Sequence, residues 1–303
     1  MEQRTFKDWV LATRPWSFTA SLIPVIAITA YLFYQSLAYG WVGCDWWNAL
    51  LALPMLVCLQ AAGNLISDYY DHVRNVDLPG SLNGVRHIQS GKFAPKEILR
   101  LGYVMLGVAA LFGLVILARS SWSAVWLGAA GLLMAAFYPW LKFHALGDLD
   151  VLLGYALLPA VGVSFAVTGA YHPETLLLSL PFGLHTVAIL HANNTRDILN
   201  DSRAGIRTLA MAIGPVASHW VYLAEIVLPY ALVAVYCLAG LLHPVTLLVA
   251  VTLPEAAKLI RVMMAAEPYA EAPIGGLDQR TARLQLCFGM LFTVSFLIAA
   301  WML

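Results

Sequence analysis

The sequence contains little charge. Of its 303 residues, 11% are Asp, Glu, Lys or Arg, whereas about 25% is usual in soluble domains. Hydrophobic residues make up 61% of the chain, and the mean hydropathy is +0.76. This composition excludes an ordinary soluble domain, because most of the surface of such a chain cannot face water. It predicts a polytopic membrane protein.

The chain also has no net charge and no paired-cysteine motif. The 17 Lys and Arg residues balance 17 Asp and Glu residues, and no basic cluster occurs, so no nucleic-acid partner is expected. The N-terminal stretch MEQRTFKDWVLATRPW lacks the apolar core and cleavage site of a signal peptide and predicts an interfacial segment. No C-x-x-C pair indicates a disulfide framework or thiolate metal site, and we interpret the cysteines as small buried hydrophobic residues. They are Cys44, Cys58, Cys237 and Cys287.

Long hydrophobic runs, by contrast, are abundant. A bilayer core requires about 20 apolar residues per helix, and roughly nine segments have this character. The expected fold class is therefore all-α, a polytopic bundle of about nine transmembrane helices in one membrane-embedded domain, residues 1–303. The expected spans are 16–36, 47–69, 100–118, 122–141, 149–169, 175–195, 216–240, 244–264 and 284–302.

Lys and Arg residues are distributed unevenly between the two sets of connections. With nine spans, Lys and Arg clusters fall at the N-terminus and after the even-numbered spans, and the other side retains only Arg119. The positive-inside rule then predicts a cytoplasmic N-terminus and an external C-terminus. Both long polar loops, 71–99 and 196–215, would be cytoplasmic. We therefore expect function at the cytoplasmic face of a plasma membrane, by default a bacterial inner membrane.

Two similar polar patterns occur at the cytoplasmic ends of predicted spans. The segments NLISD and NNTRD share the spacing Asn-x-x-x-Asp and stand four spans apart. This weak repeat suggests two four-helix halves, about 14–145 and 146–265, followed by a last helix.

Acidic residues recur at helical spacing in both patterns. Positions i, i+3 and i+4 share one face of a helix, so Asn64, Asp68 and Asp71 form an oxygen-rich stripe, over which Asp77 could fold back. An alternative interpretation is that these acids are solvated helix ends or pair with neighbouring arginines. Two matching stripes on one side of the membrane weigh against it. The second stripe consists of Asn193, Asp197 and Asp201.

Two facing acidic stripes would repel each other in a low-dielectric cavity and need cations. Hard oxygen ligands suit Mg²⁺, which commonly binds carboxylates together with substrate phosphates. A diphosphate fits between such ions, and a polyprenyl diphosphate would explain why the chain has so many spans. The predicted metal ligands are Asp68, Asp71, Asp197, Asp201 and Asn64, and cations that could grip the diphosphate are Lys142, Arg86, Arg196 and Arg207.

The motifs resemble those of a known family. NLISDYYDHVRNVD resembles the first aspartate-rich motif of the UbiA superfamily of intramembrane aromatic prenyltransferases, and HANNTRDILNDSRAGIRTLA resembles the second. The second motif, together with RPWSFTASLIPV, GVRHIQSGKFAP and YPWLKFHALGD, is similar to the MenA-type branch. That branch prenylates 1,4-dihydroxy-2-naphthoate for menaquinone synthesis. One departure is Ser67, which stands where the family often has Asn.

The resemblance implies a nine-helix bundle around a central cavity, open to the cytoplasm for polar substrates and to lipid for the isoprenoid. It implies Mg²⁺-dependent transfer of a polyprenyl group to an aromatic carbon, with release of diphosphate and, in the naphthoate branch, of CO₂. Lys142 matches the family's diphosphate-contacting lysine. Tyr138, one turn earlier, is expected to face the same cavity, where aromatic faces stabilise cations. Expected ligands of the aromatic acceptor are Arg14, His191, Asn193 and Asn194, and Asp77 is expected to support the first stripe.

Other functions remain open from the sequence. A transporter with an intramembrane acidic site would place charges near the bilayer midplane, with broken helices there. A phospholipid-headgroup transferase would have one continuous motif of Asp, Gly and Arg residues, which is not found. Within the prenyltransferases, 4-hydroxybenzoate, homogentisate and other acceptors are alternatives to naphthoate.

Overall fold

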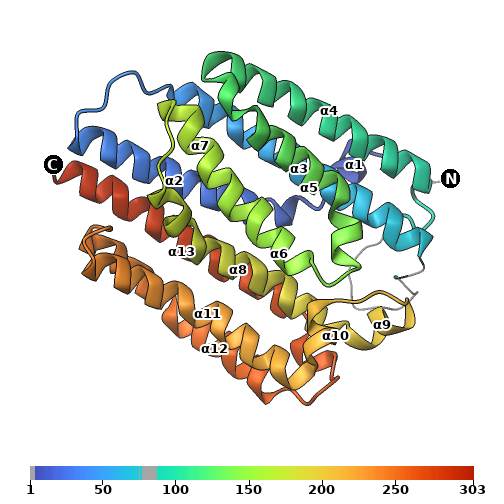
Figure 1. Ribbon diagram of the computed structural model, residues 1–303. Coiled ribbons are helices and arrows are strands. Elements are labelled where there is room, and N and C mark those ends of the chain that lie inside the picture. Colours follow the sequence, from blue (N-terminus) through green and yellow to red (C-terminus); the bar gives the residue numbers. More distant parts are fainter. Residues whose placement is uncertain (1–3, 75, 77–86) are drawn as a thin grey trace.

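The computed structural model describes residues 4–74, 76 and 87–303, which form a bundle of antiparallel helices (Figure 1). Within these residues the strand-like structure is a single isolated bridge between His144 and Arg207. The all-α prediction is therefore confirmed. The α-helices are α1 Phe6–Ala12, α2 Thr19–Ala38, α3 Trp46–Val73, α4 Pro95–Arg119, α5 Val125–Lys142, α6 Gly147–Leu152, α7 Leu158–Thr168, α8 Glu174–Arg196, α9 Ile198–Arg203, α10 Leu209–Ile213, α11 Pro215–Leu238, α12 Leu253–Ala265 and α13 Leu277–Trp301.

Eight of the helical segments in the described part of the chain are long and apolar enough to cross a membrane. They coincide with eight of the nine predicted spans. Several include a short 3₁₀ or π turn, such as the π turn Leu153–Leu157 that joins α6 to α7. These segments are Pro15–Ala38, Trp46–Val73, Pro95–Arg119, Trp122–Lys142, Gly147–Thr168, Glu174–Arg196, Pro215–Leu238 and Ala272–Trp301.

The ninth predicted span, 244–264, is helical but differs in character. It begins as the 3₁₀ helix Pro244–Thr252 and continues as α12. Only one face of α12 is buried, and it packs on α11 through apolar residues such as Leu259 and Met263. The opposite face carries charged side chains, which is the pattern of a surface helix rather than of a fully apolar span. The charged residues of α12 are Glu255, Lys258 and Arg261.

The centre of the bundle is built from α2, α8 and α13. Phe182 of α8 meets Phe292 of α13 edge to face with ring centroids 5.0 Å apart, and Tyr31 of α2 meets Phe296 at 5.4 Å. Aromatic pairs in this geometry contribute about 0.5–1.5 kcal/mol beyond the area they bury. Gly289 lets α13 approach α2, because a Cβ there would stand 2.0 Å from the Cγ2 of Ile23.

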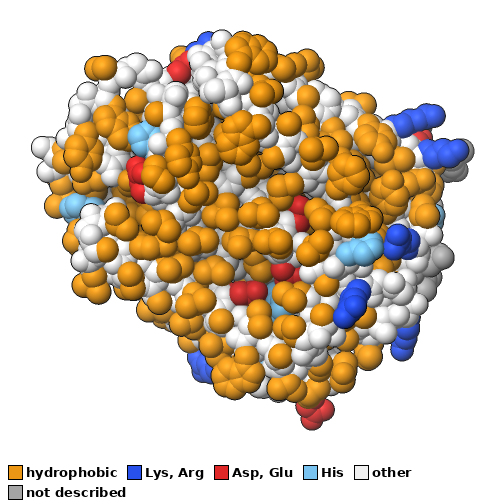
Figure 2. Space-filling model, in the orientation of Figure 1, with side chains coloured by type: hydrophobic (Ala, Val, Ile, Leu, Met, Phe, Trp, Pro, Cys, Tyr) orange, Lys and Arg blue, Asp and Glu red, His pale blue; other side chains and the backbone are white. Residues whose placement is uncertain are grey.

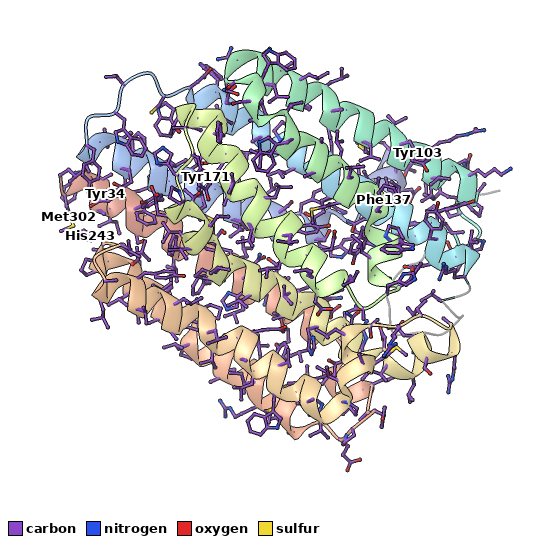
Figure 3. All side chains as sticks on the ribbon, in the orientation of Figure 1. Tyr34, Tyr103, Phe137, Tyr171, His243 and Met302 are labelled. Atoms are coloured by element: carbon purple, nitrogen blue, oxygen red, sulfur yellow. The ribbon has the colours of Figure 1, made fainter. Side chains whose placement is uncertain are left out.

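The outer helices α4 and α5 present apolar side chains outward. Tyr103 and Phe137, labelled in Figure 3, are 54% and 57% exposed. Tyr34 and His243 lie together at the other end of the bundle, with ring centroids 6.4 Å apart (Figure 3). Hydrophobic side chains dominate the face seen in Figure 2, as expected of a surface in contact with lipid.

The long connections gather at one end of the bundle. In Figure 1, the end of α3, the turn between α5 and α6, and helices α9 and α10 all lie on the right, whereas α13 ends on the left. Most of the Lys and Arg side chains in Figure 2 lie toward the same right-hand end. Arg119 lies at the opposite end, where it pairs with Asp45 at the start of α3. Both aspartate motifs therefore occupy one end of the bundle.

Candidate active site

The first aspartate motif occupies the last turns of α3. Asp71 is 2% exposed and accepts hydrogen bonds from Nζ of Lys142, which lies 3.2 and 3.1 Å from its two carboxylate oxygens. Ser67, one turn earlier, donates to the same carboxylate at 3.4 Å. Lys142 is the last residue of α5, so this ion pair joins the ends of two spans.

Asp68 and Asn64 face the N-terminal segment. Arg14 donates to and forms an ion pair with Asp68. The Asn64 amide nitrogen donates to the carbonyl of Thr13 and to Oγ of Ser17, both at 3.0 Å. Arg14 has a left-handed backbone conformation, with φ of 56°, and this turn leads the chain from α1 into the first span. The polar face of α3 therefore holds the N-terminal segment in place.

The second motif lies where α8 ends and α9 begins. Arg196 donates two hydrogen bonds to the carboxylate of Asp197, one from Nε at 2.9 Å and one from a terminal nitrogen at 2.8 Å. Its other terminal nitrogen lies 3.4 Å from Asp278 of α13. Asn193 is also within hydrogen-bond distance of Asp278, at 3.3 Å. The alternative interpretation of paired acids thus holds for Asp197 and Arg196.

The remaining residues of the second motif are also buried. Asn194 is 3% exposed and Asp201 is 7% exposed. The backbone nitrogen of Asp201 donates to the carbonyl of Asp197 at 2.8 Å, so the two aspartates stand one helical turn apart across the junction of α8 and α9. Their spacing matches the predicted stripe.

A short backbone bridge connects the two motifs. The Arg207 nitrogen donates to the Phe143 carbonyl at 3.2 Å, and the Ala145 nitrogen donates to the Arg207 carbonyl at 2.7 Å. The first residue after Lys142 is therefore bonded to the segment that follows Asp201. The Lys142 side chain thus contacts the first motif, while the backbone of the residues that follow it, Phe143 and Ala145, is bonded to the second. The Arg207 side chain is exposed.

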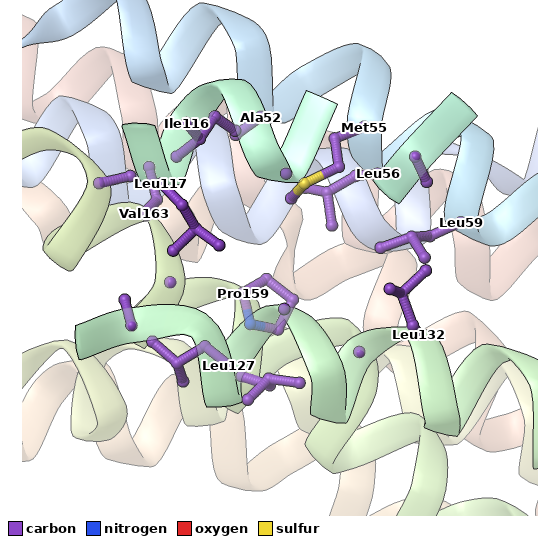
Figure 4. Close-up of a pocket in the computed structure, with 18 of the residues that line it drawn as sticks. Ala52, Met55, Leu56, Leu59, Ile116, Leu117, Leu127, Leu132, Pro159 and Val163 are labelled. Atoms are coloured by element: carbon purple, nitrogen blue, oxygen red, sulfur yellow. The ribbon is translucent and has the colours of Figure 1, made fainter. Parts of the chain in front are cut away.

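Two adjoining cavities lie within the bundle. A small cavity of about 40 Å³ is lined by polar groups that include Tyr138, Tyr155 and Asp150. It shares Leu59 and Gly131 with a second cavity of about 300 Å³. The larger cavity lies among α3, α4, α5 and α7 and is lined almost wholly by aliphatic side chains (Figure 4). Tyr138 thus lines a small, partly polar cavity that adjoins a hydrocarbon-lined space.

Polar contacts hold the N-terminal helix α1 near the same end of the bundle as the aspartate motifs. Lys92 donates to Asp8 at 2.6 Å, and the Thr5 backbone and hydroxyl donate to the same carboxylate. The Lys92 hydrogen bond, followed by those from Thr5, holds the pKa of Asp8 well below its usual range. This contact anchors α1 beside the segment that leads into α4.

Two predicted residues, Asp77 and Arg86, lie outside the described residues.

Sequence reasoning also missed several acids. Asp278 joins Arg196 at the second motif, and Asp150 lines the small cavity. Asp148 and Glu225 face His191, which is fully buried. A lone acid inside an apolar run, such as Glu225, is a signal that could have been used, because intramembrane ionisable residues are rare and usually functional.

The donor set is suited to a hard divalent cation. Four carboxylates of the two motifs are buried or half-buried at one end of the bundle, and oxygen ligands of this kind are those that Mg²⁺ prefers. Three of the four already balance their charge with Arg14, Lys142 or Arg196. This end of the bundle therefore contains both carboxylates and cations, and such a set of groups can accept metal ions together with an anionic ligand.

Comparisons with known proteins identify the family of the chain. The profile of the UbiA prenyltransferase family matches residues 21–272. UbiA prenyltransferase domain-containing protein 1 of Homo sapiens is 33% identical over 321 residues, covering 99% of this chain and 87% of that protein. The homologue from Drosophila melanogaster is 31% identical over 299 residues, covering 95% of this chain and 79% of that protein.

Solved structures of low sequence identity share the fold. The apo structure of a UbiA homolog from Aeropyrum pernix K1 superposes with a TM-score of 0.70 at 18% identity, covering 94% of this chain and 98% of that chain. A UbiA homolog from Archaeoglobus fulgidus, bound to GPP and Mg²⁺, superposes with a TM-score of 0.61 at 15% identity, covering 94% and 99%.

The helical bundle and its paired carboxylates define an integral membrane enzyme with an acidic site at one end. The chain belongs to the UbiA prenyltransferase family and is a prenyltransferase.

Proposed function

We propose that this protein transfers a polyprenyl group from a polyprenyl diphosphate to 1,4-dihydroxy-2-naphthoate, with release of diphosphate and CO₂, as a step of menaquinone synthesis. The observation that carries the proposal is the position of the Lys142–Asp71 pair. This pair stands at the acidic end of the bundle, one turn from Tyr138, which lines the small cavity next to the apolar one. A charged end beside a hydrocarbon-lined space matches the two ends of a polyprenyl diphosphate.

Mg²⁺ fits the carboxylates of both motifs, and the GPP and Mg²⁺ complex of the Archaeoglobus fulgidus homolog supports its use here. When bound by Asp68, Asp71, Asp197 and Asp201, Mg²⁺ supplies Lewis-acid neutralisation of the leaving diphosphate. Asn64 contributes by holding the N-terminal segment against α3.

The protein's own cations divide into two roles. Lys142 is partly exposed, so it can turn from its carboxylate to donate to phosphate oxygens. Arg196 is 5% exposed and is shared between Asp197 and Asp278. We therefore assign Arg196 to positioning these carboxylates rather than to gripping the diphosphate. The exposed Arg207 side chain remains available to the diphosphate.

The apolar cavities accept the isoprenoid and keep water from the allylic cation. Tyr138 lies where the reacting carbon would stand between the diphosphate and the tail, and an aromatic face there stabilises a cation by about 0.5–2 kcal/mol. From Tyr138 to Leu127, α5 runs for about 16 Å at 1.5 Å per residue, and both residues line the cavities. This length suits a chain of several isoprene units.

The naphthoate acceptor is proposed from the second motif. Its side chains Asn193 and Asn194, with Arg14 across the site, are the groups we expect to bind the acceptor's carboxylate and hydroxyl oxygens. We further propose that the site faces the cytoplasm from a bacterial inner membrane, with the N-terminus on the same side. The two halves, about 14–145 and 146–265, would then contribute one motif each.

Product analysis tests the function. The purified protein is given Mg²⁺, a polyprenyl diphosphate and an equimolar mixture of 1,4-dihydroxy-2-naphthoate and 4-hydroxybenzoate, and products are identified by mass spectrometry. We expect prenylated, decarboxylated naphthoate and an equal amount of diphosphate. Prenylated hydroxybenzoate alone would overturn the acceptor assignment. Absence of any prenylated product with both acceptors would overturn the proposed reaction.

A further inference from the structure

A second polar cluster lies behind the aspartate motifs, inside the bundle. It consists of Asp148 of α6, His191 of α8 and Glu225 of α11, which are 7%, 0% and 7% exposed. Nδ1 of His191 lies 3.3 Å from Oδ1 of Asp148 and 4.0 Å from Oε1 of Glu225. One donor atom from each residue lies within 4.8 Å of those of the other two.

The cluster lacks a cationic partner among the described residues. Asp71 and Asp197, which are equally buried, each pair with a Lys or Arg. Asp148 and Glu225 face the His191 imidazole, which is charged only when protonated, and Oδ2 of Asp148 and Oε2 of Glu225 have no hydrogen-bond partner in the described chain. Two ionised carboxylates facing one imidazole would leave an excess of negative charge in a low-dielectric interior, which is costly unless protons or a bound cation compensate for it.

We propose that Asp148, His191 and Glu225 bind one divalent transition-metal ion, in a site distinct from the magnesium site of the aspartate motifs. An imidazole nitrogen with two carboxylate oxygens is a ligand set for ions such as Zn²⁺ or Mn²⁺. Ligand atoms at about 2.0–2.2 Å from one ion stand up to about 4 Å apart. Both distances from His191 meet this limit, and the three donor atoms all lie within 4.8 Å of one another.

The position of the cluster gives the ion a structural role. α6 follows Lys142 after a short loop, and His191 lies less than two turns before Asp197 in α8. Both α6 and α11 pack against α8. An ion shared by these three helices would fix the elements that carry Lys142 and the second motif. It would position the active site without contacting the substrate.

Metal analysis tests this inference without substrate, so its outcome is independent of the proposed reaction. Protein grown with added Zn²⁺ and Mn²⁺ is purified in metal-free buffer and measured by inductively coupled plasma mass spectrometry. We expect about one equivalent of metal in the wild type, and a loss of at least about ten-fold in the affinity for Zn²⁺ in Asp148→Asn and Glu225→Gln, since even outer ligands matter by this amount.

Asp150→Asn is the matched control. Asp150 is 4% exposed, lies on the same short helix, and has an unpartnered Oδ1, but it is not a member of the cluster. This variant should keep the metal. If Asp148→Asn and Glu225→Gln retain wild-type metal content, the site assignment is wrong.

A wild-type measurement removes dependence on variants that fail to fold. Protein stripped with a chelator is titrated with Zn²⁺ alone while its melting temperature is recorded. We expect the melting temperature to rise with Zn²⁺ concentration, since binding to the native state stabilises it by mass action. No metal in the purified protein and no rise on titration would overturn the proposal.

Discussion

The two aspartate motifs balance their charge in different ways. Asp68 and Asp71 pair with Arg14 and Lys142, which lie 54 and 71 residues away in the sequence. Asp197 instead pairs with Arg196, its immediate neighbour. The first motif is therefore assembled by the packing of separate segments, whereas the core of the second is formed within one helix end. The first should depend more on tertiary structure, and the second should be more rigid.

The largest expected effect is on turnover when either motif loses a carboxylate. Asp71→Asn and Asp197→Asn should each lower kcat by at least about 100-fold, since a well-placed electrostatic group contributes about 3–4 kcal/mol to a transition state. Diphosphate release measures this. Asp45→Asn is the control, because Asp45 also pairs with an arginine but lies at the opposite end of α3. Near wild-type turnover in both motif variants would show that these acids do not bind metal.

The next largest effect should be a difference between the two motifs in the free energy of unfolding lost when each loses its cation. Arg196→Met leaves Asp197 and Asp278 without their shared cation in a site where Arg196 is 5% exposed, and breaking a buried pair costs about 3–5 kcal/mol. Lys142→Met affects only Asp71, which keeps the Ser67 hydroxyl, so a smaller cost of about 1–3 kcal/mol is expected. Thermal unfolding in detergent measures both. A lower melting temperature for Lys142→Met than for Arg196→Met would reverse the comparison.

The bridge between the motifs can be broken through the backbone alone. Arg207→Pro removes the N–H group that donates to Phe143 and should cost about 1–3 kcal/mol. Arg207→Ala keeps this N–H and removes an exposed side chain, so it should unfold near the wild-type temperature. Unfolding curves of the two variants test the difference. Equal melting temperatures would mean that the bridge does not hold the motifs together.

The smallest effect should come from the N-terminal segment. Asn64→Ala loses hydrogen bonds to Thr13 and Ser17, a loss of about 1–2 kcal/mol. Because Arg14 would then be less well placed, KM for the aromatic acceptor should rise several-fold while kcat changes less. Gln35→Ala, which loses a hydrogen bond to Tyr31 at the other end of α2, should leave KM unchanged. An unchanged KM in Asn64→Ala would remove Arg14 from the substrate site.

The bundle itself was predictable because spans are long and apolar, and eight of them have the expected places. The aspartate motifs at the ends of α3 and α8 were equally predictable from the sequence, since the aspartate spacing marks one face of a helix. The side-chain partners of these aspartates were not predictable from the sequence, because the pairing of Lys142 with Asp71 depends on how α5 packs on α3. Asp148 and Glu225 escaped notice for the same reason. Only the packing of α6 and α11 against α8 brings them to His191.

The most direct test is a structure of the protein with Mn²⁺ in place of Mg²⁺ and an unreactive polyprenyl diphosphate analogue, with the ions located by anomalous scattering. The account predicts ions bound by carboxylates of both motifs, the diphosphate between them and Lys142, and the tail in the cavity among α3, α4, α5 and α7. Ions at one motif only, or a diphosphate remote from Lys142, would contradict it.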